Sequence, residues 1–181
     1  IKQCLVGSEM CIRDSGCGSG ETFNLDKLRY GKVIILTDAD ADGMHIATLL
    51  MAFFFQHMRP LIEEGNLYLG KPPLFGVFGK STSAKKKGPS KFWAYSDAEL
   101  DKVLSKNKLS SPRIVRYKGL GEMNPETLWE TTLDPDTRTL LRVSIDDKEI
   151  VTEGLQSLMG TDSSTRYELI QTYASEIVLD V

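Results

Sequence analysis

Apolar residues gather in short runs along the first half of the chain, and each run ends in polar or turn-forming residues. Residues 32–37 (KVIILT) are mostly β-branched or apolar, which is typical of a strand buried on both faces. Residues 45–64 predict a helix, apolar on nearly every side at first, that Pro60 kinks or restarts. Gly65 fits the helix end, and residues 66–69 begin another strand. Strand, helix and strand in this order predict the parallel crossover unit of an α/β domain.

The second half mixes short strands with capped helices. Residues 79–91 form a low-complexity stretch that predicts a basic loop. Ser96 fits the cap of a helix, with Glu99 completing a capping box, and Asn124-Pro125 and Asp134-Pro135 each fit a helix start. The further strands are expected at residues 113–117 and 140–145, and the further helices at residues 97–105, 149–159 and 165–177.

Composition indicates an ordinary soluble globular protein. The chain has 181 residues, of which 41% are hydrophobic and 26% charged. No apolar run approaches the roughly 20 residues that span a bilayer, and the first residues lack the pattern of a secretory signal. Cys4, Cys11 and Cys17 are odd in number and lack CxxC spacing, which argues against a zinc site or a disulfide framework. We therefore expect free thiols and a reducing, cytoplasmic setting.

The net charge of −3 hides an uneven distribution. Residues 80–118 contain eleven Lys or Arg and three Asp or Glu, whereas the flanking segments are acidic. A basic middle is what a polyanion-binding face would require. A solvated loop is the simpler interpretation, since residues 85–87 are three lysines set among Ser, Gly and Pro.

The central motif is a ladder of three aspartates, Asp38, Asp40 and Asp42, directly after the first strand. On an extended segment, alternate side chains point the same way, so the three carboxylates would repel one another without a cation. Mg²⁺ prefers oxygen ligands and typically binds one or two carboxylates plus water and substrate phosphate. Gly43 then permits a tight turn into a helix whose N-terminus would face the phosphate.

The ladder alone does not define a reaction. A strand ending in DxD also opens the haloacid-dehalogenase phosphatases, where Asp38 would attack a phosphoryl group. That alternative needs a downstream lysine and a second acidic motif, for which Asp146-Asp147 is a weak candidate.

Four motifs in order resemble the B-type subunits of bacterial type IIA DNA topoisomerases, those of gyrase and topoisomerase IV. Residues 28–54 (LRYGKVIILTDADADGMHIATLLMAFF) are similar to the TOPRIM domain of that family. Further matches are LYLGKPPLF at 67–75, RYKGLGEMNPETLWETTLDPDTR at 116–138, and LMG at 158–160 followed by Arg166. The phosphatase alternative accounts for the first motif only. The fold expected from the resemblance is α/β, a TOPRIM-type parallel sheet flanked by helices, with a C-terminal mixed α+β extension.

The resemblance implies ATP-driven cleavage and religation of double-stranded DNA, which changes its topology by supercoiling or decatenation. By that analogy Asp38, Asp40 and Asp42 hold Mg²⁺, while His45, Lys118 and Arg166 contact DNA. A capping or packing histidine, a solvated turn lysine and a plain surface arginine are the competing interpretations. The implied partners are DNA and an A-type subunit, which together with the B-type subunit forms a heterotetramer and supplies the nucleophilic tyrosine. No membrane partner is expected.

The chain also departs from the family. The EGDSA-like segment with the general acid/base glutamate is absent, as are the ATP-binding domain and the transducer. We therefore expect a fragment that is inactive alone, with ATP bound elsewhere in the full subunit. The expected parts are a non-family or artefactual leader at 1–15, a partial TOPRIM domain at 16–79, a basic loop at 80–95 and a C-terminal extension at 96–181. A non-catalytic module that binds DNA or the partner subunit remains an alternative, and the motifs do not separate gyrase from topoisomerase IV.

Overall fold

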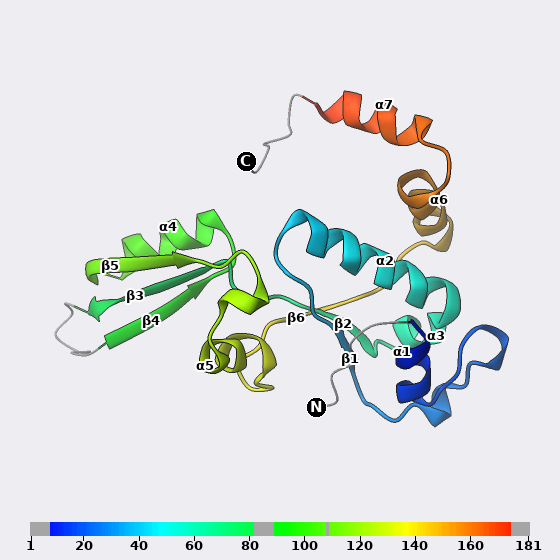
Figure 1. Ribbon diagram of the computed structural model, residues 1–181, viewed down its shortest axis with the longest axis horizontal. Helices are drawn as coiled ribbons and strands as arrows, with labels where there is room; N and C mark the ends of the chain where they lie inside the picture. The colour runs from blue at the N-terminus through cyan, green and yellow to red at the C-terminus, as the bar shows by residue number, and fades with distance from the viewer. Residues whose placement is uncertain (1–7, 82–88, 108, 175–181) are drawn as a thin grey trace. The chain divides into compact units, whose positions relative to one another are not determined.

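The computed structural model describes residues 8–81, 89–107 and 109–174. The chain divides into two compact units, residues 1–143 and 144–181. In the first unit, helices combine with two three-stranded sheets, whereas the described part of the second unit is helical (Figure 1). The predicted α/β class is confirmed.

The first sheet contains the predicted crossover unit. Its order is β1 (Val33–Ile35), β2 (Leu67–Gly70) and β6 (Leu140–Arg142). β1 and β2 are parallel, whereas β6 pairs with β2 in the antiparallel direction. The connection between β1 and β2 runs through α2 (Ala41–His57) and α3 (Arg59–Glu63). This unit places the residues after β1 at the carboxyl end of a parallel strand, where α/β sheets usually bind ligands.

The boundaries of this unit differ from those expected. β1 ends at Ile35, and α2 begins at Ala41 rather than at residue 45 because Asp40 caps it. α2 stops at Met58, whose φ of −142° is not helical, and α3 restarts with Pro60 in its first turn, where a missing N–H costs little. Gly65 follows α3 with a φ of +76°, a left-handed conformation that glycine adopts without strain.

The core of the first sheet is formed by one face of α2 with α3 and the strands. α2 buries Ala47, Phe54 and Phe55, while Met44 and Leu49 are exposed. The helix predicted from this apolar run is therefore buried on one face only, and some of its apolar side chains in the first turns stay exposed. The other buried apolar residues of this core are Ile35, Met58, Leu61, Ile62 and Leu67.

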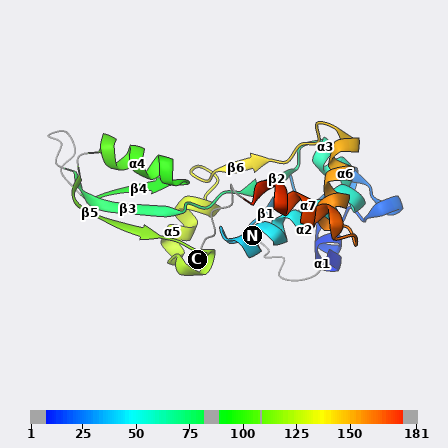
Figure 2. The ribbon, with the colours of Figure 1, turned by 90° about the horizontal axis from the view of Figure 1, so that it is seen from above.

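The second sheet is antiparallel, with β3 (Phe75–Ser81) in the middle and a helix alongside. Its order is β4 (Pro89–Ala94), β3 and β5 (Leu109–Arg116), and α4 (Asp97–Lys106) lies beside it (Figure 2). The predicted loop at 80–95 is corrected in part, since residues 80–81 and 89–94 belong to strands. Its lysines at 85–87 lie outside the described residues.

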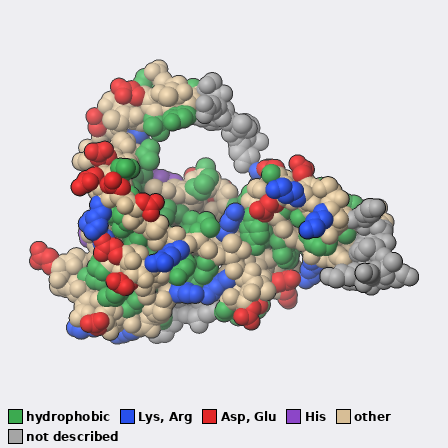
Figure 3. Space-filling model, turned by 180° about the vertical axis from the view of Figure 1, so that it is seen from behind, with side chains coloured by type: hydrophobic (Ala, Val, Ile, Leu, Met, Phe, Trp, Pro, Cys, Tyr) green, Lys and Arg blue, Asp and Glu red, His purple; other side chains and the backbone are tan. Residues whose placement is uncertain are grey.

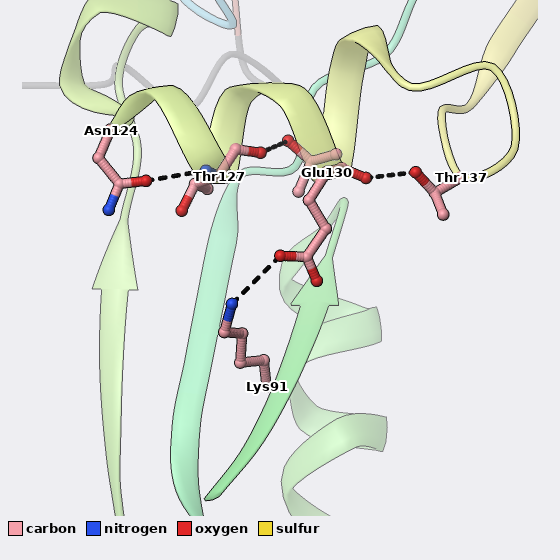
Figure 4. A network of polar contacts seen from close by, with 6 residues as sticks. Lys91, Asn124, Thr127, Glu130 and Thr137 are labelled. Carbon is pink, nitrogen blue, oxygen red and sulfur yellow. Dashed lines mark hydrogen bonds and ion pairs between the residues drawn. The ribbon is translucent and has the colours of Figure 1, made fainter.

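Two helix caps in the first unit follow the sequence. The Ser96 side chain accepts a hydrogen bond from the Glu99 amide at 3.2 Å, and the Glu99 carboxylate accepts one from the Tyr95 amide rather than from Ser96 itself. The Asn124 side chain accepts from the Thr127 amide at 2.8 Å and caps α5 (Pro125–Leu128) (Figure 4). Local sequence was sufficient to predict these two starts.

Short helical turns fill the rest of the first unit. α1 (Ser8–Ser15), η1 (Gly20–Thr22) and η2 (Leu25–Lys27) precede β1, so regular structure begins earlier than expected and includes part of the supposed leader. Cys17, a free thiol, is buried beside them. After β5 come η3 (Leu120–Glu122), α5 and a π-helical turn, η4 (Trp129–Leu133). Asp134-Pro135 starts no helix; it forms a turn in which the Asp134 side chain accepts from the Asp136 amide.

The described part of the second unit contains two helices, α6 (Lys148–Met159) and α7 (Ser164–Tyr173). Asp147 caps α6 by accepting from two backbone amides. Many large apolar side chains are exposed in the protein, and the face drawn in Figure 3 shows them among charged ones. The described helices include none that is long and apolar enough to cross a membrane.

Candidate metal centre

The three predicted metal ligands lie in three different local settings. Asp38 is in the irregular segment between β1 and α2, Asp40 is the cap of α2, and Asp42 is in the first turn of α2. The expectation that all three carboxylates point the same way from an extended segment was therefore wrong. The helix starts at Ala41, and its rotation of about 100° per residue ends the two-residue alternation.

Asp40 is fixed by its role as the cap. Its Oδ1 atom accepts a hydrogen bond from the Gly43 amide at 2.6 Å, which satisfies one of the unpaired donors at the helix start. Gly43 is buried, and a Cβ atom there would run into the Asp38 backbone, including its carbonyl oxygen. The glycine therefore lets the first turn of α2 pack against the segment that carries Asp38.

Asp38 is fixed from a distant part of the chain. Its Oδ1 atom accepts a hydrogen bond from the Leu120 amide at 2.8 Å, across 82 residues of sequence. A Cβ atom at Gly119 would lie 3.1 Å from the Asp38 carboxyl carbon, so the loop backbone approaches the carboxylate closely. Fragments of the two longest sequence motifs therefore meet at one carboxylate.

These residues border one open hollow of about 280 Å³, lined by Asp38, Asp40, Lys118, Gly119, Gly121 and Glu122. The Glu122 side chain accepts a hydrogen bond from the Lys118 amide at 2.8 Å, which closes the loop. Sequence reasoning selected Lys118 but missed Glu122. The spacing in KGLGE could have indicated Glu122, because a carboxylate four residues after Lys118 can reach back over a short helical turn to the Lys118 amide.

Asp38 and Asp40 offer carboxylate oxygens, the donors that a hard divalent cation such as Mg²⁺ prefers. Asp38 and Asp40 each have Oδ1 tied to a backbone amide, and no described residue donates a hydrogen bond to either Oδ2 atom. One or two carboxylates, completed by water and phosphate, are what Mg²⁺ typically uses. Within residues 8–81, 89–107 and 109–174, no group of three or more His, Cys, Asp or Glu side chains is placed to hold a metal ion.

The predicted DNA contacts lie in different surroundings. His45 is exposed in the second turn of α2, and exposed Lys118 borders the hollow. Arg166 lies in α7 of the second unit, where its Nη1 atom donates to the Gly160 carbonyl at 2.6 Å. That contact satisfies a carbonyl just after the end of α6, so Arg166 has a structural role whatever else it binds.

Two family models match this chain. The Toprim domain matches residues 15–71, and the carboxyl terminus of the DNA gyrase B subunit matches residues 110–171. The first match contains Asp38 and Asp40, and the second contains Lys118 and Glu122. The hollow therefore takes residues from both matched regions.

Relatives named as the B-type subunit of DNA gyrase are similar over most of the chain. The protein from Thermotoga maritima is 48% identical over 162 residues, which is 90% of this chain and 24% of that protein. The Archaeoglobus fulgidus protein is 44% identical with the same coverage. The Thermus thermophilus protein is 45% identical over 166 residues, 91% of this chain and 25% of that protein.

A Toprim domain followed by this carboxyl-terminal region defines the B-type subunit of a type IIA DNA topoisomerase. The chain belongs to that family, and the relatives described above carry the name of the gyrase subunit. It spans about a quarter of their length. The phosphatase alternative finds no support in these matches.

Proposed function

We propose that this chain is the part of a B-type subunit of a type II DNA topoisomerase that binds Mg²⁺ at the DNA phosphate during double-strand cleavage and religation. The carrying observation is the hollow in which Asp38 and Asp40, from the Toprim region, meet Lys118, from the carboxyl-terminal region. Two anionic oxygen donors beside an ammonium group suit a metal-bound phosphate diester, since each charge has a partner of opposite sign.

The residues of the hollow have separate tasks. Asp38 and Asp40 would hold the ion through Oδ2, and Asp42 remains a predicted third ligand or support. When bound, Mg²⁺ would stabilise charge on the attacked phosphate and on the 3′ oxygen. Lys118 would neutralise a non-bridging phosphate oxygen, and the N-terminus of α2 adds a positive dipole end. His45 and Arg166 stay proposed DNA contacts.

The rest of the reaction lies with partners and with other parts of the full-length protein. The proposed partners are DNA and an A-type subunit that supplies the attacking tyrosine in a heterotetramer. The general acid/base glutamate and the ATP site belong to regions of the family not present in this sequence. The similar relatives favour gyrase, hence supercoiling, over topoisomerase IV, and the proposed location is the cytoplasm.

The test uses the full-length B-type subunit assembled with its A-type partner. Asp38→Asn and Asp40→Asn should each abolish Mg²⁺-dependent DNA cleavage while the protein stays folded, because the amide removes ligand charge but keeps shape. Asp101→Asn is the matched control, since Asp101 is exposed within α4. If both site variants cleave DNA like the wild type, the proposed metal role fails, and the alternative of a non-catalytic module that binds DNA or the partner subunit remains. Phosphate release from small phosphomonoesters by this chain would restore the phosphatase alternative.

A further inference from the structure

We propose that the loop of residues 118–122 is a positioning device that orients the Asp38 carboxylate as a metal ligand. The proposal rests on the proposed function and adds a specific role for this loop. The residues that act are the Leu120 amide, Gly119 and Glu122, and their effect on the ion passes through Asp38. They are therefore positioning residues.

Asp38 has no regular element of its own to fix its direction. It lies three residues beyond the end of β1 and before the cap of α2, where no strand or helix constrains its side chain. The 2.8 Å hydrogen bond from the Leu120 amide ties Oδ1 to the loop. The backbone at Gly119 lies against the same carboxylate, so the side chain has little room to turn on that side. Oδ2 is the oxygen left for a ligand.

The loop is held by a hydrogen bond beside β3 before it, by two hydrogen bonds within it and by a buried side chain after it. Before it, the buried Tyr117 donates its amide to the Leu74 carbonyl at 2.8 Å, which continues the pairing of β3 with β5. Within it, Glu122 accepts from the Lys118 amide at 2.8 Å. Its turn is closed by the Met123 amide, which donates to the Leu120 carbonyl at 3.2 Å, and the Met123 side chain after it is buried. A loop anchored in this way can impose a direction on Asp38 rather than follow it.

This arrangement couples the two matched regions chemically. A metal ligand in the Toprim region receives its orientation from a backbone amide in the carboxyl-terminal region. Groups that hydrogen-bond to a metal ligand typically change metal affinity about 10- to 100-fold when they are lost. The expected result of losing the Leu120 amide is therefore weaker metal binding rather than loss of the fold.

Leu120→Pro removes that single donor and puts the ring Cδ atom where the N–H pointed, so the Asp38 carboxylate must also move away from the loop. Leu120 is the first residue of η3, a position that accepts proline because its N–H is not used within the helix. Gly119 has φ −156° and ψ 164°, an extended conformation that a residue before proline adopts readily. Leu120→Ala is the matched control, because it shortens the side chain and keeps the N–H.

The measurement is Mn²⁺ binding to the full-length protein, followed by electron paramagnetic resonance, together with the Mg²⁺ concentration for half-maximal cleavage by the assembled enzyme. Leu120→Pro should raise the Mn²⁺ dissociation constant and the Mg²⁺ concentration for half-maximal cleavage about tenfold or more. Maximal cleavage should be recovered at high Mg²⁺. Leu120→Ala should change both values by less than about twofold, since the donor remains. Equal affinities for wild type and Leu120→Pro, or equal losses in both variants, would overturn the proposal.

A second variant decides the matter if Leu120→Pro does not fold. Gly119→Ala should push the Asp38 carboxylate aside and weaken Mn²⁺ binding several-fold, because its Cβ atom would crowd the carboxyl group. Gly31→Ala is its control, since a Cβ atom there meets nothing within 4 Å. Unchanged Mn²⁺ binding by Gly119→Ala would contradict the proposed role of the loop. If Asp38→Asn also binds and cleaves like wild type, the proposed function itself fails; if only the loop variants do, the proposed function stands.

Discussion

Asp40 carries two separable roles, as the cap of α2 and as a proposed ligand. It takes an extended conformation, with φ −100° and ψ 179°, and accepts from the Gly43 amide at 2.6 Å. Replacing a capping Asp by Ala typically costs about 1 kcal/mol, in a range of roughly 0.5–2 kcal/mol. The negative charge at the helix start adds about 0.3–1 kcal/mol through the helix dipole. Asp40→Ala should therefore lower the free energy of unfolding by about 1–2 kcal/mol.

Asp40→Asn separates the two roles. Asn caps helices about as well as Asp, so the hydrogen bond to Gly43 is kept. The lost dipole interaction is offset in part by relief of the repulsion from Asp38 and Asp42. The free energy of unfolding should therefore change by less than about 0.5 kcal/mol, whereas Mg²⁺-dependent cleavage by the assembled enzyme should be lost.

Urea unfolding without metal provides the measurement. Both tryptophans, Trp93 and Trp129, lie in the first unit, so their fluorescence reports on the unit that contains Asp40. With a slope of about 1–3 kcal/mol per molar urea, a loss of 1 kcal/mol moves the midpoint by roughly 0.3–1 M. Asp40→Asn destabilising the unit as much as Asp40→Ala would refute the capping argument. Cleavage retained by Asp40→Asn would contradict the ligand argument.

Three further predictions concern stability. Gly43→Ala should destabilise the first unit by about 1–3 kcal/mol, because its Cβ atom would run into the Asp38 backbone. Gly154→Ala in α6 has open space around it and should stabilise its helix by up to about 1 kcal/mol. Urea unfolding followed by circular dichroism compares the two variants. Burial raises the pKa of the Tyr117 hydroxyl above its ordinary value of 10.0. The unfolded chain therefore loses this proton at lower pH than the folded protein, and the free energy of unfolding should fall as pH rises past 10. Tyr117→Phe should make that fall less steep in alkaline unfolding curves. Lys91 and Glu130 form an exposed ion pair at 3.2 Å, and Lys91→Met should cost less than about 1 kcal/mol, a difference that should shrink further in high salt. A larger, salt-independent loss would contradict that assignment.

The crossover unit, and two helix caps outside it, were determined by local sequence. The apolar runs fix where β1, β2 and α2 lie, since burial of a periodic face depends on neighbours in the chain. The caps at Ser96 and Asn124 also follow from local hydrogen bonds. The motif order was enough to identify the family, which the matches confirmed.

Local sequence failed where two local patterns compete. The alternation of polar positions predicted three carboxylates on one side of an extended segment. Asp40 instead accepts a hydrogen bond at the helix start, and α2 begins at Ala41. Asp42 therefore lies in the helix and no longer follows the two-residue alternation. The basic stretch was expected to be a loop, yet residues 89–94 pair with β3, because strand pairing depends on a partner outside the stretch. Asp134-Pro135 likewise had the sequence of a helix start and forms only a turn.

Local patterns alone place Asp38 and Asp40 after a buried strand and make KGLGE a compact turn. That the two segments meet is a result of the tertiary fold. The hydrogen bond from the Leu120 amide to Asp38 joins residues 82 positions apart, and Glu122 borders the same hollow. No periodicity or propensity encodes such a contact, because it depends on how β5 returns the chain beside the end of β1. The aspartates are local in origin, but their orientation is a property of the fold.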